Sequence, residues 1–443
     1  MKRGMTRRDF IRVSGLTGLI TSASVSGLSC PGFPVSDSNA SAEFFEITYG
    51  PSGKKLRGGL WYNPDFSGER PLIISSHGFG ASAVDLSSLH NSLANDGYII
   101  LASDYRDFIN LSSSEELRNS HDYKEIENNF GSLENYVNYV LFTQQEGKKE
   151  SLINLHIDVL NSLFFDTINK IKAVPGYEDI DNFLDFYILL NRSFMCGVKN
   201  ERVISILGEA MYGTRVNDTS TLADFSLGDN FTGNNPDGVN IIDEMSHGKI
   251  NINPESIGGL GYSLGGGTML QLIGAGDIPE REITYKDPRF EGIPMVLIAP
   301  TSGPSYYENF PGIRNDILWM GGDEDNLIKG IARTQPLTNG SKETIFFWNS
   351  GHLAFSDTIC SRVGSLIVNN SPLTEQLWGN CESYESIVQD KNKYASLFFK
   401  RSLGKEKQTE LIDEAESNPN VRFATDLPID EAEFEEAFPG YKL

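Results

Sequence analysis

The chain has 443 residues, of which 39% are hydrophobic and 11% aromatic, so it can bury one large core or two modest ones, and disorder is not expected. Its 37 basic and 60 acidic residues give a net charge of −23. This balance argues against nucleic acid and anionic membrane surfaces as partners, because both attract a basic face.

Residues 1–42 are typical of an export signal. The run T-R-R-D-F-I-R at residues 6–12 matches the twin-arginine consensus, and an uncharged stretch rich in Gly, Ser and Thr follows it over residues 13–36. The sequence contains no run of about twenty strongly apolar residues that would favour a membrane anchor instead. We therefore expect export of the folded protein by the twin-arginine machinery, with a periplasmic, lipid-anchored or secreted destination.

The processing of this signal has two competing interpretations. The stretch G-L-S-C ending at Cys30 is an imperfect lipobox and would place a lipid anchor on that cysteine. The small residues A-S-A at positions 40–42 instead fit a signal peptidase site.

The other cysteines, Cys196, Cys360 and Cys381, suit an oxidising compartment, in which a disulfide between Cys360 and Cys381 could close a short surface loop. No Cys or His cluster has zinc-like spacing, so we expect no metal site.

The first part of the chain predicts a βαβ unit beside an edge hairpin. Residues 44–60 alternate in polarity around a turn at 51–53, as antiparallel edge strands do. Residues 71–75 and 98–103 are short apolar runs typical of strands that are buried on both faces. The helical pattern of residues 83–95 lies between them, and this order of elements is a βαβ unit.

The strand pattern then stops, and residues 108–212 show only helical periods, which predicts an inserted helical cap. The pattern resumes with a helix at 215–227, a loop rich in Asn, Asp and Gly at 229–253, strands at 256–260, 293–299, 316–320 and 344–348, and a helix at 387–401. The chain is thus divided into a signal (1–42), a core (43–107 and 213–403), the cap (108–212) and an acidic tail (404–443). We interpret this tail as a solvated helix or a frayed end.

One serine lies at a strand-to-helix junction. The sequence G-Y-S-L-G at residues 261–265 interrupts an apolar run that resumes at once as a helix, which is the form of a nucleophile elbow. Gly261 and Gly265 would allow the tight turn that lifts the hydroxyl of Ser263 clear of a sheet. Since a serine becomes a nucleophile only when a base takes its proton, the pattern predicts a histidine and an orienting carboxylate elsewhere.

The order of residues along the chain limits the candidates for this histidine and this carboxylate. Of six histidines only His352 follows Ser263, and it lies in a loop directly after an apolar strand. Between the two, the strand at 316–320 opens into the run G-G-D-E-D, in which Asp325 and Asp323 compete for the role of the acid. The G-x-x-D spacing and the apolar pair that follows favour Asp325, with Asp323 as the alternative.

The oxyanion of an acyl-transfer reaction needs two backbone donors. One is expected from Leu264, at the start of the helix, and the other from Phe79, in the run H-G-F-G that ends the strand at 71–75. We interpret His77 as a structural residue that braces this loop.

The run that contains Asn235, Asp237, Gly238 and Glu244 partly matches a calcium loop, but Gly233 stands at the first ligand position. A surface loop rich in Asx turns is the better interpretation.

Taken together, these motifs resemble the α/β-hydrolase superfamily over residues 45–105 and 214–402. The final motif, G-H-L-A-F-S-D at 351–357, is similar to the branch of platelet-activating-factor acetylhydrolases and dienelactone-hydrolase-like proteins. The chain departs from that pattern at Tyr262, where His is frequent, and in its long insertion. The resemblance implies a mostly parallel sheet with helices on both faces, and a cofactor-free serine esterase or lipase that passes through an acyl-enzyme.

The expected function is therefore an exported serine hydrolase that cleaves carboxylic esters, either small molecules or lipids. The aromatic-rich insertion favours an apolar acyl or alcohol part, because ligand pockets are mostly apolar. Two alternatives stay open: a peptidase or amidase that uses the same residues, and a surface-binding protein that keeps the fold without catalysis.

Overall fold

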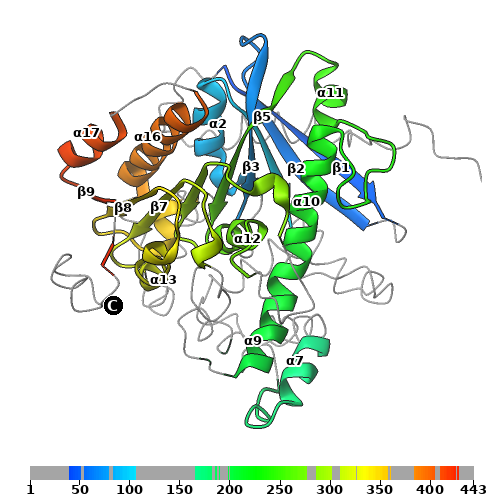
Figure 1. The fold of residues 1–443 in the computed structure, drawn as a ribbon, viewed down its shortest axis with the longest axis vertical. Coiled ribbons are helices and arrows are strands. Elements are labelled where there is room, and N and C mark those ends of the chain that lie inside the picture. Colours follow the sequence, from blue (N-terminus) through cyan, green and yellow to red (C-terminus); the bar gives the residue numbers. More distant parts are fainter. Residues whose placement is uncertain are drawn as a thin grey trace, which may run out of the picture.

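The protein is built around one mixed sheet with helices on both faces (Figure 1). The computed structural model describes residues 39–50, 54–78, 83–105, 165–181, 185–186, 189, 198, 200–276, 286–301, 310–325, 327–357, 360, 384–404, 410–425 and 427–428. The signal segment before residue 39, most of the predicted cap and the acidic run at 430–436 lie outside these residues.

The described strands form a nine-stranded sheet in the order β1-β2-β4-β3-β5-β6-β7-β8-β9. The strands from β4 to β8 in this order run parallel, whereas β1, β2 and β9 add antiparallel pairings at the two edges. Their bounds are β1 Ser41–Tyr49, β2 Lys54–Tyr62, β3 Glu69–Ser76, β4 Ile99–Asp104, β5 Asn251–Tyr262, β6 Met295–Ile298, β7 Ile317–Gly322, β8 Lys342–Phe347 and β9 Val421–Ala424. This is the α/β-hydrolase fold that the motifs predict.

The central strands contain continuous apolar runs, such as residues 72–74 of β3 and 295–298 of β6, because both of their faces are buried there. In β3, Leu72 and Ile74 belong to the core on one side of the sheet, whereas Ile73 belongs to the core on the other side. Ile73 pairs with Ile100 of β4 on one edge and with Gly258 of β5 on the other. Such a strand shows no alternation of polarity, which is why a short continuous apolar run marks it in the sequence.

Helices cover both faces of the sheet. On one side lie α2 and the C-terminal pair α16 and α17, and on the other side lie α10, α12 and α13 (Figure 1). The helix bounds are α2 Ser87–Asn95, α7 Phe165–Lys172, α9 Glu201–Gly208, α10 Thr214–Leu227, α11 Ile241–Ser246, α12 Leu264–Leu272, α13 Ile328–Thr334, α16 Tyr384–Leu403 and α17 Glu410–Ser417. Short helical turns are η2 Ala83–Leu86, η4 Glu209–Gly213 (a π turn), η5 Pro288–Phe290, η6 Phe310–Gly312, η7 Gln335–Leu337 and η8 His352–Phe355.

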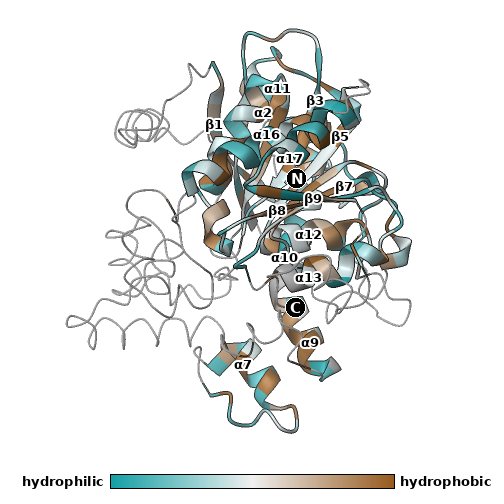
Figure 2. Ribbon diagram, turned by 90° about the vertical axis from the view of Figure 1, so that its left-hand side faces the viewer, coloured by the Kyte–Doolittle hydropathy of each residue, from teal (hydrophilic) through white to brown (hydrophobic). Residues whose placement is uncertain are grey.

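Hydrophobic residues gather on the strands between the helical layers, and hydrophilic residues on the outer helical surfaces (Figure 2). Of the helices that the structure describes, none combines the length and apolar character needed to cross a membrane. The predicted strands and the helices at 83–95, 215–227 and 387–401 are confirmed, with boundaries shifted by a few residues.

Two predicted irregular segments contain regular structure. The loop predicted over 229–253 includes helix α11, and β5 already begins at Asn251. The tail predicted from residue 404 is in part folded onto the core, because α17 buries Leu411 and Ala415, and β9 pairs antiparallel with β8. For residues 410–424 the interpretation as a solvated or frayed end was therefore wrong, because α17 and β9 pack on the core. For residues 430–436 it stays a prediction.

The predicted boundary of the cap falls inside a long helical stretch. Helix α9, the π turn and α10 follow one another without a break from Glu201 to Leu227 (Figure 1). Helix α7 contacts α9, and both lie below the sheet in the view of Figure 1. The helices predicted at 115–142 and 179–195, and the first part of the one at 151–172, lie mainly or wholly outside the described residues, so the division into core and cap stays a prediction.

Candidate functional site

Ser263 is held in a strained turn at the carboxyl end of the central strand β5. Its φ of 54° and ψ of −121° are outside the regions that residues other than glycine ordinarily adopt. The backbone keeps this conformation because the Ser263 N–H donates to the Ile298 carbonyl at 2.9 Å and the Ser263 carbonyl accepts from the Thr301 N–H at 3.0 Å. Strain at one residue, fixed by neighbours on both sides, is typical of functional positions.

The flanking glycines are required by space. A Cβ atom at Gly265 would lie 2.0 Å from the Ser76 carbonyl oxygen, and one at Gly261 would lie 2.6 Å from the Gly266 Cα. Both contacts involve backbone, so neither could be relieved by a side-chain rotation. The close approach of α12 to strands β3 and β5 therefore depends on these two positions.

The structure brings Ser263, His352 and Asp325 together, although they are separated in sequence by up to 89 residues. The Ser263 Oγ lies 2.8 Å from His352 Nε2, and His352 Nδ1 lies 2.8 Å from Asp325 Oδ2. Since an ionised carboxylate can only accept, Nδ1 carries the proton and Nε2 is left to accept from the serine hydroxyl. All three side chains are buried, with Ser263 the most exposed at 7%.

The two competing aspartates have different partners. Asp325 accepts the Leu327 N–H on Oδ1 at 2.8 Å and His352 on Oδ2, so both of its oxygens are used inside the site. Asp323 accepts the Ser350 N–H at 2.9 Å and thereby stabilises the loop that leads to His352. The geometry therefore places Asp325 in contact with the imidazole, and Asp323 in contact with the backbone of the loop that precedes His352.

The segment that follows His352 is tied to both helices behind it. Asp357 accepts the Ser88 N–H at 2.6 Å at the start of α2, and the Ser88 hydroxyl at 2.8 Å. The buried Lys391 of α16 donates to the Phe355 carbonyl at 2.9 Å and lies 3.4 Å from Asp357. These contacts explain the S-D ending of the motif at 351–357, because Asp357 fixes the loop that carries the histidine.

Of the two predicted oxyanion donors, the structure describes one. Leu264 is the first residue of α12, so its N–H has no acceptor within the helix and lies at the positive end of the helix dipole. Phe79 lies outside the described residues. The turn before it is described: His77 Nδ1 contacts the Gly78 carbonyl at 2.7 Å, and His77 Nε2 accepts the Tyr105 N–H at 3.0 Å.

His77 is a neutral structural residue, as the sequence predicted. Burial and the nearby positive charge of Arg215 hold its pKa well below the ordinary value of 6.5. The neutral ring donates from Nδ1 and accepts at Nε2, and protonation would turn Nε2 into a second donor facing the Tyr105 N–H.

Arg215, which sequence reasoning missed, clamps the same turn from α10. Its guanidinium donates to the His77 carbonyl at 2.6 Å and to the Gly78 carbonyl at 2.9 Å, and it stacks over the Tyr105 ring at 4.5 Å. The sequence did hold a signal for this contact, because the arginine lies in a helix that was expected to pack on the sheet. A guanidinium buried there requires several acceptors, such as backbone carbonyls.

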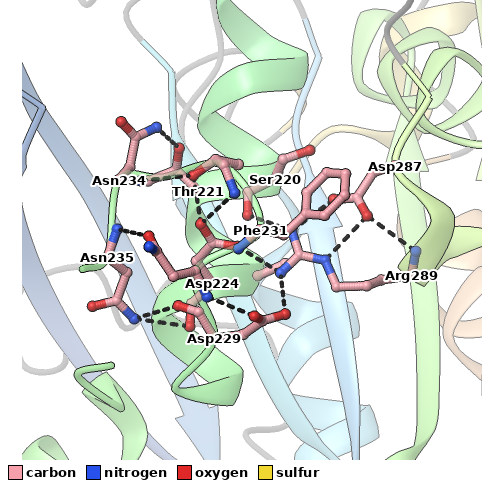
Figure 3. Close-up of polar contacts among 12 residues, drawn as sticks. Ser220, Thr221, Asp224, Asp229, Phe231, Asn234, Asn235, Asp287 and Arg289 are labelled. Atoms are coloured by element: carbon pink, nitrogen blue, oxygen red, sulfur yellow. Dashed lines mark hydrogen bonds and ion pairs between the residues drawn. The ribbon is translucent and has the colours of Figure 1, made fainter. Parts of the chain in front are cut away.

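A second polar cluster, centred on Asp224 and Arg289, lies at the C-terminal part of α10 (Figure 3). Asp224 accepts the Phe231 and Thr232 N–H groups, and Arg289 bridges Asp224 and Asp287 at 2.6 and 2.7 Å. Asn235, from the weak calcium match, donates to the Asp224, Asp229 and Val239 carbonyls and accepts the Val239 N–H. The cluster holds the 229–240 loop against α10.

Within the described part of the chain, no group of His, Cys, Asp and Glu side chains is arranged to hold a metal ion. Cys360 is disulfide-bonded. The other cysteines, including the predicted partner Cys381 and the predicted lipid acceptor Cys30, lie outside the described residues.

A family comparison agrees with the resemblance seen in the motifs. The family model described as platelet-activating factor acetylhydrolase, isoform II, matches residues 46–156, which is about a quarter of the chain. This stretch contains β3 and the His77 turn but ends before Ser263, Asp325 and His352. Among solved structures, a ferulic acid esterase from Streptomyces cinnamoneus is similar, with 14% identity, a TM-score of 0.46, and coverage of 89% of this chain and 98% of that chain. A search of curated proteins finds no match.

Proposed function

We propose that the protein is a serine hydrolase that cleaves carboxylic esters through an acyl-enzyme, with Ser263 as nucleophile, His352 as base and acid, and Asp325 as the orienting carboxylate. The observation that carries this proposal is the continuous relay from Ser263 Oγ through His352 to Asp325, with 2.8 Å at each step. The position of Ser263 on a strained elbow supports the same role, since such a turn lifts the hydroxyl clear of the sheet.

In the proposed reaction, the Ser263 oxygen attacks the ester carbonyl while His352 Nε2 takes the hydroxyl proton. The carbonyl oxygen becomes an oxyanion, which the backbone N–H groups of Leu264 and Phe79 would stabilise. The ester C–O bond then breaks, and the departing alkoxide takes the proton from the imidazolium. Water, deprotonated by the same nitrogen, then attacks the acyl carbon. The bond from this carbon to the Ser263 oxygen breaks, the imidazolium returns its proton to that oxygen, and the carboxylic acid is released. Asp325 stays ionised and stabilises the imidazolium in both halves.

An amidase on the same residues would need a poorer leaving group to be protonated. Matched p-nitrophenyl ester and p-nitroanilide substrates with one acyl group separate the two activities, and the proposal expects turnover of the ester to dominate. A series of acyl lengths then defines the substrate, for which an apolar acyl or alcohol part is proposed.

Labelling with a fluorophosphonate probe tests the proposal most directly. Wild-type protein should label and Ser263→Ala should not, because the probe forms a bond to the activated oxygen. Ser226→Ala is a matched control, since Ser226 is also buried and only donates within α10 to the Ala223 carbonyl at 2.9 Å. Equal labelling or equal ester turnover of Ser263→Ala and wild type would refute Ser263 as the nucleophile. A wild-type protein that neither labels nor hydrolyses the ester would leave a non-catalytic binding protein as the better account.

We also propose that residues 1–42 direct export by the twin-arginine machinery. The support is the T-R-R-D-F-I-R run and the uncharged stretch after it. Replacing Arg7 and Arg8 with Lys should retain the protein in the cytoplasm, and fractionation of cells measures this. Export that is unchanged would contradict the proposal. Cys30→Ala distinguishes a lipid-anchored product, which it would release from the membrane, from a periplasmic or secreted one, which it would not affect.

A further inference from the structure

Tyr262 precedes the proposed nucleophile and contacts the proposed base directly. We infer that Tyr262 is a positioning residue, which holds both the backbone and the ring of His352 in the orientation that proton transfer requires. This inference rests on the proposed function, and it adds a residue to which neither the motifs nor the comparisons assign a role. It also gives a reason for a tyrosine at a position where the related motif frequently has histidine.

The backbone of the base is held by a hydrogen bond. The Tyr262 hydroxyl donates to the His352 carbonyl oxygen at 2.9 Å, across 90 residues of sequence. Burial, together with the negative charges of Asp85, Asp325 and Asp357, raises the pKa of Tyr262 well above its ordinary value of 10. The phenol therefore stays protonated and remains a donor wherever the protein is folded.

The ring of the base is held by stacking. The Tyr262 and His352 rings lie nearly parallel, with centroids 5.3 Å apart and an angle of 24° between their planes. Asp325 and Ser263 contact the two nitrogens at the edge of the imidazole, so they leave its faces unrestrained. A flat ring against one face limits rotation about the bond that joins the imidazole to the side chain, and this rotation would carry Nε2 away from Ser263.

The same side chain lies against the turn after β3. A Cβ atom at Gly78 would be 3.1 Å from two carbons of the Tyr262 ring and 3.2 Å from the Ser263 Cβ. Tyr262 thus lies between that turn and the loop of His352, and it is covalently joined to Ser263. A change in its position would alter the spacing among these three parts of the site.

Only tyrosine provides both contacts at this position. Phenylalanine keeps the flat ring but loses the hydroxyl, and leucine loses the hydroxyl and the ring. Histidine keeps a flat ring, but the ring is shorter than a phenol, so its donor would not reach the His352 carbonyl. The variants Tyr262→Phe, Tyr262→Leu and Tyr262→His therefore separate the hydrogen bond from the stacking contact.

The experiment measures kcat and KM of these variants on a p-nitrophenyl ester, beside wild type, Ser263→Ala and a remote control. The control is Tyr49→Phe, since Tyr49 lies on the edge strand β1, and its buried hydroxyl donates to Asp218 of α10. Tyr262→Phe and Tyr262→His should lower kcat about fivefold, as expected for one lost hydrogen bond, and Tyr262→Leu about 50-fold, with KM unchanged. Proton NMR of the low-field His352 Nδ1–H signal gives a second readout, which should broaden in the Tyr262 variants and not in Tyr49→Phe.

A wild-type kcat in Tyr262→Phe and Tyr262→Leu would overturn the inference. An equal loss of kcat in Tyr49→Phe would also overturn it, because the loss would then reflect lower protein stability and not a change in the position of His352. If Tyr262→Leu does not fold, the nearly isosteric Tyr262→Phe still decides. Activity that survives in Ser263→Ala would refute the proposed function itself, whereas an inactive Ser263→Ala with fully active Tyr262 variants refutes only the role of Tyr262.

Discussion

Replacing Asp325 with Asn should lower kcat by about 10³- to 10⁴-fold while the fold is retained. In the wild type, Asp325 Oδ1 accepts the Leu327 N–H and Oδ2 accepts His352 Nδ1–H, each at 2.8 Å. An amide has only one oxygen, so Asn can satisfy one of these donors. If the oxygen stays on Leu327, the NH₂ group faces Nδ1 and selects the tautomer with its proton on Nε2, which cannot accept from Ser263.

The opposite orientation of the amide is also unfavourable. The NH₂ group would then face the Leu327 N–H, and two donors would meet in a site where the residue is only 2% exposed. The expected loss corresponds to about 4 to 5.5 kcal/mol in the activation free energy. Steady-state hydrolysis of p-nitrophenyl acetate measures kcat, and thermal unfolding shows whether the variant is folded.

Asp323→Asn is the matched control, because an amide oxygen can still accept the Ser350 N–H that Asp323 accepts at 2.9 Å. Its kcat should stay within about threefold of wild type, with a loss of about 1 kcal/mol in unfolding free energy at most. A large loss of kcat in Asp323→Asn together with a nearly normal Asp325→Asn would refute the assignment and make Asp323 the orienting acid.

Three further predictions concern the frame of the site. Gly265→Ala should cost about 3 kcal/mol or prevent folding, because its Cβ would lie 2.0 Å from the Ser76 carbonyl, and chemical denaturation measures this. Arg215→Lys should lower kcat about tenfold with little change in KM, because a single ammonium cannot hold both the His77 and Gly78 carbonyls; a wild-type kcat would contradict this. Burial, together with the positive charge of Lys391, lowers the pKa of His90 from 6.5 to about 3. The unfolded chain therefore binds a proton at a higher pH than the folded protein does, and the folded state loses stability as the pH falls below about 6.5. His90→Gln should flatten the pH dependence of the denaturation midpoint between pH 6.5 and 4, and an unchanged slope would count against it.

Much of the fold was predictable because buried strands and amphipathic helices leave simple patterns. The apolar runs at 71–75 and 98–103 correspond to β3 and β4, and the helical period at 387–401 corresponds to α16. The segment after residue 404 was misjudged since its many carboxylates dominate its composition. In α17 and β9 three side chains are buried, those of Leu411, Ala415 and Val421, and this weak apolar signal is hidden by the many charged residues around it.

The choice between the aspartates shows the limit of local pattern. Asp323 and Asp325 are two residues apart in one acidic turn, and spacing favoured Asp325 without excluding the other. The decision depends on how the turn after β7 faces the loop after β8, since one aspartate meets the imidazole and the other a backbone N–H. The packing of neighbouring strands determines how these two loops face each other, and a local sequence pattern does not contain this information.

The sequence by itself determined the fold class, the elbow at Ser263 and the one histidine that follows it, because these depend on local turn chemistry and on chain order. Only the tertiary structure decided which carboxylate meets His352, that Arg215 clamps the turn after β3, and that Tyr262 lies against the imidazole. These are contacts across 27, 138 and 90 residues of sequence, which arise where the carboxyl ends of parallel strands converge on one edge of the sheet.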